Sequence, residues 1–336
     1  MSLAMKPVVS VVTPCFNAAD TLPRAVASVR RQTLAGWEMV IADDGSTDGQ
    51  TREVARSLVD DRVRLIELSP NRGPGVTRNA AIRAARADII MPLDADDELT
   101  PDALRAIVAA FVEDPTADFV YGHYVCVSLD GEEREIHAGP MSDPGLIPWH
   151  VLSPYRRRFW ERAGGYDERP SFSAGAEDWI MWLRALDRGA RGKAIPVALM
   201  RYYRRVGSLS SEVHPVRVRA VLEAFDELRE LLGVQRARAA LAWTARSAAL
   251  YWRTRRRPWN ALGFLGATLG HHPELRGVWR IMLACLVESG LPPLRSRYPI
   301  LPDADPVPVA RVARLRGRHP RPQSPTAEVY RPSTAP

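Results

Sequence analysis

The sequence contains almost no lysine. Lys6 and Lys193 are the only lysines among its 46 basic residues, which leaves 46 − 2 = 44 arginines. Coding bias in a GC-rich genome explains this preference more simply than any ligand does, so we interpret it as a mark of bacterial origin. We therefore expect no nucleic-acid partner, although the formal net charge is +7.

Cysteine is also scarce. Cys15, Cys126 and Cys285 are far apart, and no Cys-x-x-Cys pair occurs. This excludes a disulfide framework and a cysteine-rich zinc site. The N-terminus lacks a signal-peptide pattern, and no apolar run approaches the ~20 residues that span a bilayer. We expect a cytoplasmic protein that is soluble or at most peripheral at the inner membrane face.

What is present indicates a globular protein with a core. The chain has 336 residues, and this length predicts about two domains. It is 46% hydrophobic and 25% charged, which is the composition of a soluble globular protein. The first half alternates β-branched runs with helical patterns, which favours a mostly parallel α/β sheet with helices on both faces. Expected strands are 7–14, 37–43, 63–68 and 87–97; expected helices are 20–33, 50–58, 75–86 and 100–114, the last with Thr100 as N-cap and Pro101 at its first position.

The second half has a different texture. From residue 216 to about 290 the pattern is almost wholly helical, and the chain then becomes rich in proline and arginine. We predict an α/β domain at 6–213, a small all-helical domain at 214–290 and a disordered tail at 291–336. The helical domain is expected to pack on the first domain; dimerisation, acceptor binding or contact with an anionic membrane are the alternatives.

Three polar segments follow predicted strands, and ligands of parallel sheets bind at these carboxyl ends. The first, "TPCFNAAD", offers backbone groups and the flat ring of Phe16. The second, "ADDGSTD", presents Asp43 and Asp44 before a glycine, where a carboxylate can accept from a base imide or a ribose hydroxyl. The third, "LDADDE", contains Asp94 and Asp96.

An Asp-x-Asp pair in an extended segment places both side chains on one face. Hard divalent cations such as Mg²⁺ or Mn²⁺ take oxygen ligands and commonly bridge carboxylates to phosphates. The alternative is a solvated acidic turn. In either case we expect Asp97 and Glu98 to charge the N-terminus of the next helix.

Taken together, the motifs carry a specific resemblance. "VSVVTPCFNAADTLPRAVASVRRQT", "WEMVIADDGSTDGQT", "NRGPGVTRNAAIRAARADIIMPLDADDELTPDAL", "ERAGGYDE" and "AEDWIMWLRAL" occur in this order. Over about residues 6–212 the chain resembles glycosyltransferase family 2, whose members have the Rossmann-like GT-A fold. The resemblance implies inverting transfer of a sugar from a nucleotide diphosphate sugar, UDP- or dTDP-linked.

The resemblance also implies roles for donor-binding residues. Thr13, through its backbone, and Phe16 would hold the base, and Asp43 would accept from the pyrimidine imide. Arg78 would approach the base or the diphosphate, the alternative being a surface arginine on a helix. Gly75 would let the backbone come close to the donor, unless it only serves the entry to the helix.

The metal site is implied in the same way. Asp94 would contact the ribose or donor sugar and share the cation, and Asp96 would bind Mg²⁺ or Mn²⁺. Many relatives carry a further histidine in a Tyr-Arg-x-His context, where this sequence has Val206. His214 could replace it only if the loop folds back, and the alternative is that Arg204, Arg205, Ser208 or Ser210 holds the diphosphate directly. The other histidines, including His123 and His137, show no ligand spacing and are expected to be ordinary; the rest are His150, His271, His272 and His319.

For the reaction itself the resemblance points to "AGAEDWIMW". Inverting transfer needs one base on the acceptor hydroxyl, opposite the leaving diphosphate. Asp178 would be that base, and Glu177 would orient the acceptor or tune Asp178 by repulsion. The alternative is an acidic first helical turn. Trp179 and Trp182 could form a floor for a sugar or belong to the core.

Other classes of function are less compatible with the motifs. A sugar nucleotidyltransferase would need a glycine-rich loop with arginine and lysine after the first strand, and "TPCFNAAD" lacks it. A non-catalytic nucleotide-sugar sensor or scaffold is opposed by Asp94, Asp96 and Asp178. The expected acceptor is a carbohydrate, a lipid-linked sugar or a small molecule, as in cell-surface polysaccharide biosynthesis, and a homodimer is an open alternative.

Overall fold

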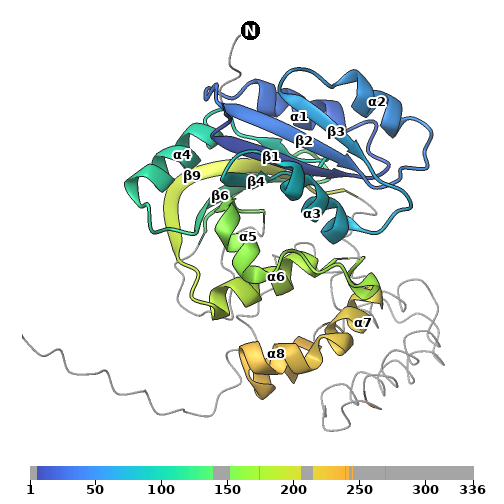
Figure 1. The fold of residues 1–336 in the computed structure, drawn as a ribbon, viewed down its shortest axis with the longest axis vertical. Helices are drawn as coiled ribbons and strands as arrows, with labels where there is room; N and C mark the ends of the chain where they lie inside the picture. Colours follow the sequence, from blue (N-terminus) through green and yellow to red (C-terminus); the bar gives the residue numbers. More distant parts are fainter. Residues whose placement is uncertain are drawn as a thin grey trace, which may run out of the picture.

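A computed structural model describes residues 6–138, 152–173, 175–205 and 215–238, with four further positions in the helical region. Strands and helices alternate through the first half as the sequence predicts (Figure 1). The strands are β1 (Val9–Cys15), β2 (Trp37–Asp43), β3 (Val63–Glu67), β4 (Ile89–Pro92), β5 (Glu98–Leu99), β6 (Phe119–Val127), β7 (Glu133–Ile136), β8 (Tyr155–Arg156) and β9 (Gly192–Tyr203). The helices are α1 (Leu22–Arg30), α2 (Thr51–Ser57), α3 (Pro74–Ala84), α4 (Ala103–Glu113), α5 (Arg157–Ala163), the 3₁₀ turn η1 (Pro170–Phe172), α6 (Glu177–Asp187), α7 (Pro215–Glu223) and α8 (Phe225–Leu232).

The sheet is parallel in its first half and mixed in its second. Its strand order in the described chain is β3-β2-β1-β4-β8-β6-β9-β5, with β7 paired to β6. The pairs β3–β2, β2–β1 and β1–β4 are parallel, because a helix connects each strand to the next. The two-residue strand β8 runs antiparallel to β4 and β6, and β5 runs antiparallel to β9. The expected α/β fold is confirmed, with a curled and mixed sheet.

Helices cover both faces of this sheet, which explains why its central strands are apolar on both sides. Residues of α1, α2 and α4 share one buried cluster with the sheet, including Val26, Ala55 and Ile107. Residues of α3, α5 and α6 form the cluster on the other face, including Ile82 and Trp182. Figure 1 shows these two sets of helices on opposite sides of the sheet.

The C-terminal helices pack on the back of α6. Ile180 and Leu183 of α6 are buried against Val221 of α7 and Phe225 of α8. Helix α6 is therefore held from two sides, since Met181 and Trp182 face the sheet. The start of the predicted helical domain is helical, while the boundary at 213/214, most of 239–290 and the tail lie outside the described residues.

One predicted helix start is wrong. Helix α4 begins at Ala103 and not at Pro101, and Thr100 does not cap it. The Thr100 hydroxyl donates to the Ala198 carbonyl of β9 at 2.6 Å. The Gln32 side chain accepts the Leu104 N–H at 3.0 Å and so satisfies a free donor at the start of the helix.

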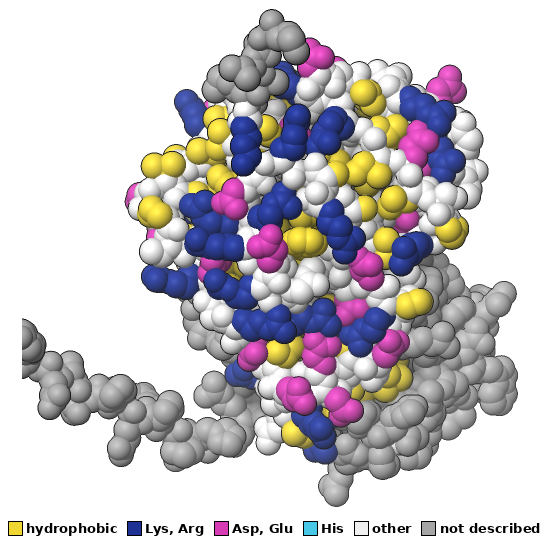
Figure 2. Space-filling view, in the orientation of Figure 1, with side chains coloured by type: hydrophobic (Ala, Val, Ile, Leu, Met, Phe, Trp, Pro, Cys, Tyr) yellow, Lys and Arg dark blue, Asp and Glu magenta, His cyan; other side chains and the backbone are white. Residues whose placement is uncertain are grey.

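The arginine excess does not form one continuous basic patch on the face in Figure 2. There, Lys and Arg side chains are interleaved with acidic and hydrophobic ones. Many arginines are in ion pairs, such as Arg56 with Glu67 and Arg64 with Glu38. Within the described ranges, no helix is both long enough and apolar enough to cross a bilayer.

Candidate active site

The ends of β1 and β2 form one wall of the site. Cys15 and Asp43 are register partners in the parallel ladder, and the Asp44 N–H donates to the Cys15 carbonyl at 2.8 Å. Phe16 follows directly, and its side chain is 44% exposed. An exposed flat ring at a sheet edge offers a stacking surface. Thr13 lies within β1 and is fully buried, and its hydroxyl has no hydrogen-bond partner.

Asp43 is fully buried and held by its own turn. Its carboxylate accepts the Ser46 N–H at 3.3 Å, the Ser46 hydroxyl, and Arg52 Nε at 2.8 Å. Its neighbour Asp44 accepts the backbone N–H groups of Arg72 and Gly73 at 3.0 and 2.7 Å. Asp44 therefore fixes the entry to α3, a role that the sequence analysis did not assign.

The acidic segment after β4 is a turn and not an extended strand. Strand β4 ends at Pro92, and the Asp97 N–H donates to the Asp94 carbonyl at 3.1 Å. Carboxylate oxygens of Asp94, Asp96 and Asp97 all lie within 4.8 Å of one another. The turn thus brings together the two aspartates that the sequence selected and a third that it did not.

This cluster fits a hard divalent cation. Burial, and next the charge of Asp94, raises the pKa of Asp96 above its usual range. Burial, and next the charges of Asp96 and Asp94, raises the pKa of Asp97 well above the ordinary value. Asp97 Oδ2 is buried without a hydrogen-bond partner. A cation bound to these oxygens would relieve the repulsion and satisfy that atom.

The expected role of Asp97 and Glu98 at the next helix is wrong. Asp97 is only 1% exposed, and its carboxylate accepts the Tyr203 N–H at 2.9 Å. Glu98 accepts the Tyr203 hydroxyl at 2.6 Å and pairs with Arg24 and Arg31 at 3.3 and 3.2 Å. Both acids therefore tie the turn to β9 and α1. These contacts follow from the pairing of β5 with β9, and they cannot be predicted from the local charge pattern of the sequence.

Arg78 connects this turn to helix α6. One guanidinium nitrogen donates to Asp94 Oδ1 at 2.7 Å, and the other donates to Glu177 Oε1. The Arg78 side chain is only 6% exposed, so it is not the surface arginine of the alternative interpretation. Burial alone would lower its pKa, but the carboxylates of Asp94 and Glu177 raise it well above the ordinary value. The Arg78 guanidinium is therefore held between two carboxyl groups.

Glu177 and Asp178 form the first turn of α6. Glu177 is 3% exposed, and burial, followed by the charge of Asp178, raises its pKa to about 7. Asp178 is half-buried, and its Oδ1 accepts the Trp179 N–H at 2.6 Å. Of the two carboxylates, Asp178 is the one that solvent or a substrate can reach.

Gly75 brings helix α3 close to α6. A Cβ at this position would lie 2.4 Å from the Asp167 carbonyl oxygen and 3.3 Å from Glu177 Cβ. Only glycine fits this contact, and the contact lets Arg78 reach Glu177. The structure therefore gives Gly75 a packing role within the protein.

Trp182 of α6 and Asp167, which lies before that helix, both have structural contacts. Trp182 is fully buried in the sheet-side core and packs edge-on against Phe119 with ring centroids 4.9 Å apart. It cannot be an exposed floor for a sugar. Asp167 is bonded to Arg169 and Arg184 at 2.7 and 2.8 Å, so it braces α6.

Arg205 is a residue near the cluster that the sequence offered only as an alternative. Its guanidinium lies 3.4 Å from Asp96 Oδ2, at the end of β9, and its side chain is 44% exposed. Val206 and His214 lie outside the described residues. The signal in the sequence was the arginine pair before Val206, where the resemblance implies a histidine.

The chain is similar in sequence to a known protein family and to proteins of known name. The model of the family "Glycosyl transferase family 2" matches residues 10–180. "Succinoglycan biosynthesis protein ExoO" of Rhizobium meliloti is 34% identical over 234 residues, which cover 65% of this chain and 67% of that protein. "Putative colanic acid biosynthesis glycosyl transferase WcaA" of Escherichia coli is 35% identical over 159 residues, which cover 46% of this chain and 53% of that protein.

Solved structures resemble the chain in fold. S. aureus TarS 1-349 in complex with UDP-GlcNAc has a TM-score of 0.58 at 19% identity, covering 84% of this chain and 89% of that one. Mannosyltransferase PcManGT from Pyrobaculum calidifontis, in complex with GDP-Man and Mn²⁺, has a TM-score of 0.52 at 21% identity, covering 85% and 88%.

Proposed function

The chain belongs to glycosyl transferase family 2 and is a glycosyltransferase, and from this premise we propose that it transfers a sugar, with inversion, from a nucleoside diphosphate sugar to an acceptor hydroxyl. We propose Asp178 as the general base and the turn around Asp94 and Asp96 as the cation site. The relatives named for succinoglycan and colanic acid biosynthesis favour a bacterial polysaccharide or its precursor as acceptor.

The observation that carries the proposal is the double ion pair of Arg78. It bonds to Asp94 of the acidic turn at 2.7 Å and also to Glu177, the residue next to Asp178. Two carboxyl groups from distant parts of the sequence, Asp94 and Glu177, are thereby brought to one place. Inverting transfer needs a base and a leaving diphosphate on opposite sides of the same sugar carbon, and the closeness of these two groups supports the proposal.

The wall formed by β1 and β2 supports a nucleotide donor. The exposed ring of Phe16 can stack on a base, and the backbone of Thr13 and the Asp43 carboxylate line the same strand ends. A pyrimidine imide that reaches Asp43 must take the place of a Ser46 hydrogen bond. We therefore propose UDP or dTDP as the carrier, with Asp43 as its specific contact.

The transfer step follows from these positions. The acceptor oxygen forms a bond to the anomeric carbon while the bond from that carbon to the diphosphate oxygen breaks. The acceptor proton passes to Asp178, and the bonding electron pair leaves with the diphosphate. Asp178 is the reachable carboxylate of the pair, while Glu177 is buried against Arg78 and holds the first turn of α6 in place.

Asp94 and Asp96, with Asp97 beside them, are the residues that would hold Mg²⁺ or Mn²⁺. When bound, the cation would neutralise charge that develops on the leaving diphosphate. The exposed guanidinium of Arg205, 3.4 Å from Asp96, could contact the same phosphates and could contribute where relatives have a histidine.

Replacement of Asp178 by asparagine tests the proposal. Asparagine keeps the shape but cannot accept the proton, so transfer should fall by about 10²–10⁴-fold. Affinity for the donor, measured by calorimetry with Mn²⁺, should stay within about twofold. Asp187→Asn, an exposed change at the other end of α6, is the matched control.

The donor is identified first, by screening nucleotide sugars for thermal stabilisation and slow hydrolysis with Mg²⁺ or Mn²⁺. If Asp178→Asn retains full transfer with that donor, the assignment of the base is wrong. If no nucleoside diphosphate sugar binds at all, the proposed donor class and the donor site built from these residues are wrong.

A further inference from the structure

Two histidines that the sequence analysis treated as unrelated are neighbours in the structure. The pairs of the antiparallel β6–β7 ladder run from Val127 with Glu133 to Tyr124 with Ile136, so His123 and His137 come next. Their rings are nearly perpendicular, with centroids 4.4 Å apart. The sequence shows no ligand spacing between these two histidines, because the ladder and not the local chain brings them together.

A carboxylate completes the group. Glu135 precedes His137 by two residues and therefore points to the same face of β7. One ligand atom from each of His123, Glu135 and His137 lies within 4.8 Å of the others. We propose that this hairpin holds a second cation site, for a borderline transition metal such as Zn²⁺, separate from the acidic turn.

The donor set decides the class of metal. Two imidazole nitrogens and one carboxylate oxygen suit Zn²⁺, Ni²⁺, Co²⁺ or Cu²⁺, whereas Mg²⁺ prefers oxygen ligands alone. The acidic turn has the opposite composition, because its three ligands are carboxylates. The two sites should therefore select different ions from a mixture.

The ligands are largely uncommitted. No hydrogen bond or ion pair joins Glu135 to another described residue, while its neighbour Glu133 is paired with Arg201. Glu135 and His137 are exposed, so a hydrated ion can reach them. Among the described residues, the competing contact is the Ala138 N–H, which donates to His123 Nδ1 at 3.2 Å. A neutral imidazole has one free lone pair, so a bound ion must take the place of this hydrogen bond.

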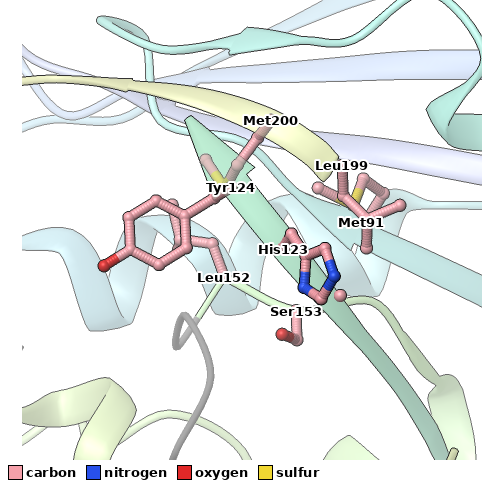
Figure 3. Close-up of a pocket in the computed structure, with 8 residues that line it drawn as sticks. Met91, His123, Tyr124, Leu152, Ser153, Leu199 and Met200 are labelled. Carbon is pink, nitrogen blue, oxygen red and sulfur yellow. The ribbon is translucent and has the colours of Figure 1, made fainter. Parts of the chain in front are cut away.

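The position of the site indicates what a bound ion does. It would cross-link β6 and β7 at the end of the hairpin away from its turn, and β7 has no other partner strand in the described chain. His123 follows Phe119 and Tyr121 at intervals of two, on the face of the sheet that packs against Trp182 of α6. Figure 3 shows His123 extending from β6 beside Leu152 and Ser153. The ion would thus stabilise a strand on the side of the sheet that carries the candidate base.

The test is titration of the full-length protein with Zn²⁺ by calorimetry, in excess Mg²⁺ so that the carboxylate site is occupied. Glu135→Gln and His137→Gln should each weaken one Zn²⁺-binding event by at least about tenfold, the loss usual even for a group that only supports a ligand. Glu132→Gln, an exposed change on the same hairpin, should leave it unaltered.

A second readout uses Co²⁺, whose visible absorption reports nitrogen ligation. The wild-type protein should give a protein-dependent band in excess Mg²⁺, and His137→Gln should lose it while keeping its circular dichroism. Equal Zn²⁺ affinity of the wild type and His137→Gln would overturn the proposal. An unchanged Co²⁺ band in that variant would do the same. Neither measurement depends on glycosyl transfer.

Discussion

Arg78 and Asp94 form an ion pair at 2.7 Å that joins helix α3 to the acidic turn after β4. The same guanidinium bonds to Glu177 at the start of α6. The candidate cation site and the candidate base are therefore not independent, because both are positioned against one buried positive charge. Changes at Arg78 should affect stability and transfer together.

Replacement of Arg78 by glutamine should lower the free energy of unfolding by about 2–3 kcal/mol, because it leaves Asp94 and Glu177 without their shared cation. The loss is smaller than for two wholly buried ion pairs, because Asp94 is 32% exposed and Glu177, whose pKa is raised, can take up a proton. Urea denaturation measures it. Arg83→Gln, on the same helix but in an exposed pair with Glu168, should cost less than about 1 kcal/mol. Equal losses for the two variants would show that the bridge does not stabilise the fold.

Stability should fall with rising pH because of Glu177. Its pKa in the folded protein is about 7, above the ordinary 4.5, so the folded state binds more protons between these values. The resulting stabilisation is complete at low pH and is lost as pH rises through about 7, and its size is on the order of 3 kcal/mol. Between pH 5 and 8, wild type should lose more stability than Glu177→Gln. If stability falls equally with pH in the wild type and in Glu177→Gln, Glu177 is not the residue with the raised pKa.

Replacement of Asp96 by asparagine should have opposite effects with and without a cation. In EDTA the variant should melt about 2 °C higher than wild type, because one of three crowded carboxylates is removed. With Mn²⁺ it should lose most of the stabilisation that the wild type gains. Differential scanning calorimetry measures both. The exposed change Asp61→Asn should alter neither; if Asp96→Asn is stabilised by Mn²⁺ as much as wild type is, the ion binds elsewhere.

Replacement of Phe16 by alanine should weaken nucleotide binding by about tenfold, the lower end of what loss of a base–aromatic stack costs. The melting temperature should change by less than about 1 °C, because the ring is 44% exposed. Calorimetry with the free nucleoside diphosphate separates binding from transfer. Leu129→Ala, which removes another exposed apolar side chain, is the control. An unchanged nucleotide affinity in Phe16→Ala would remove the ring from the donor site.

Local patterns predicted the elements of the first half well. The β-branched runs and the helical stripes are properties of neighbouring residues, so β1 to β4 and α1 to α3 could be anticipated from the sequence. The second half of the sheet could not be anticipated in the same way. Strands β5 and β8 have only two residues each and exist because of their partners across the sheet.

The sequence likewise predicted some features of the candidate site and not others. Residue type and spacing sufficed to select Asp94 and Asp96, because the chemistry of carboxylates is visible in the chain, whereas the resemblance to the family selected Glu177 and Asp178. The sequence analysis predicted a nucleotide contact for Arg78, and its ion pairs with Asp94 and Glu177 could not be foreseen. Those contacts depend on the distance between α3 and α6, which Gly75 sets by its lack of a side chain.

By itself the sequence determined the class of fold, the family and which charged residues follow the strands. The tertiary structure decided which of those charges meet. Asp97 is buried beside the candidate cation site and does not charge the N-terminus of a helix, because β9 pairs with β5 and its Tyr203 N–H bonds to the Asp97 carboxylate. His123 and His137 became a pair because an antiparallel ladder places them opposite each other. Hydrophobic periodicity indicates which residues form a helix or a strand and which of its faces is buried. Contacts between residues far apart in the sequence depend on how these elements pack on one another.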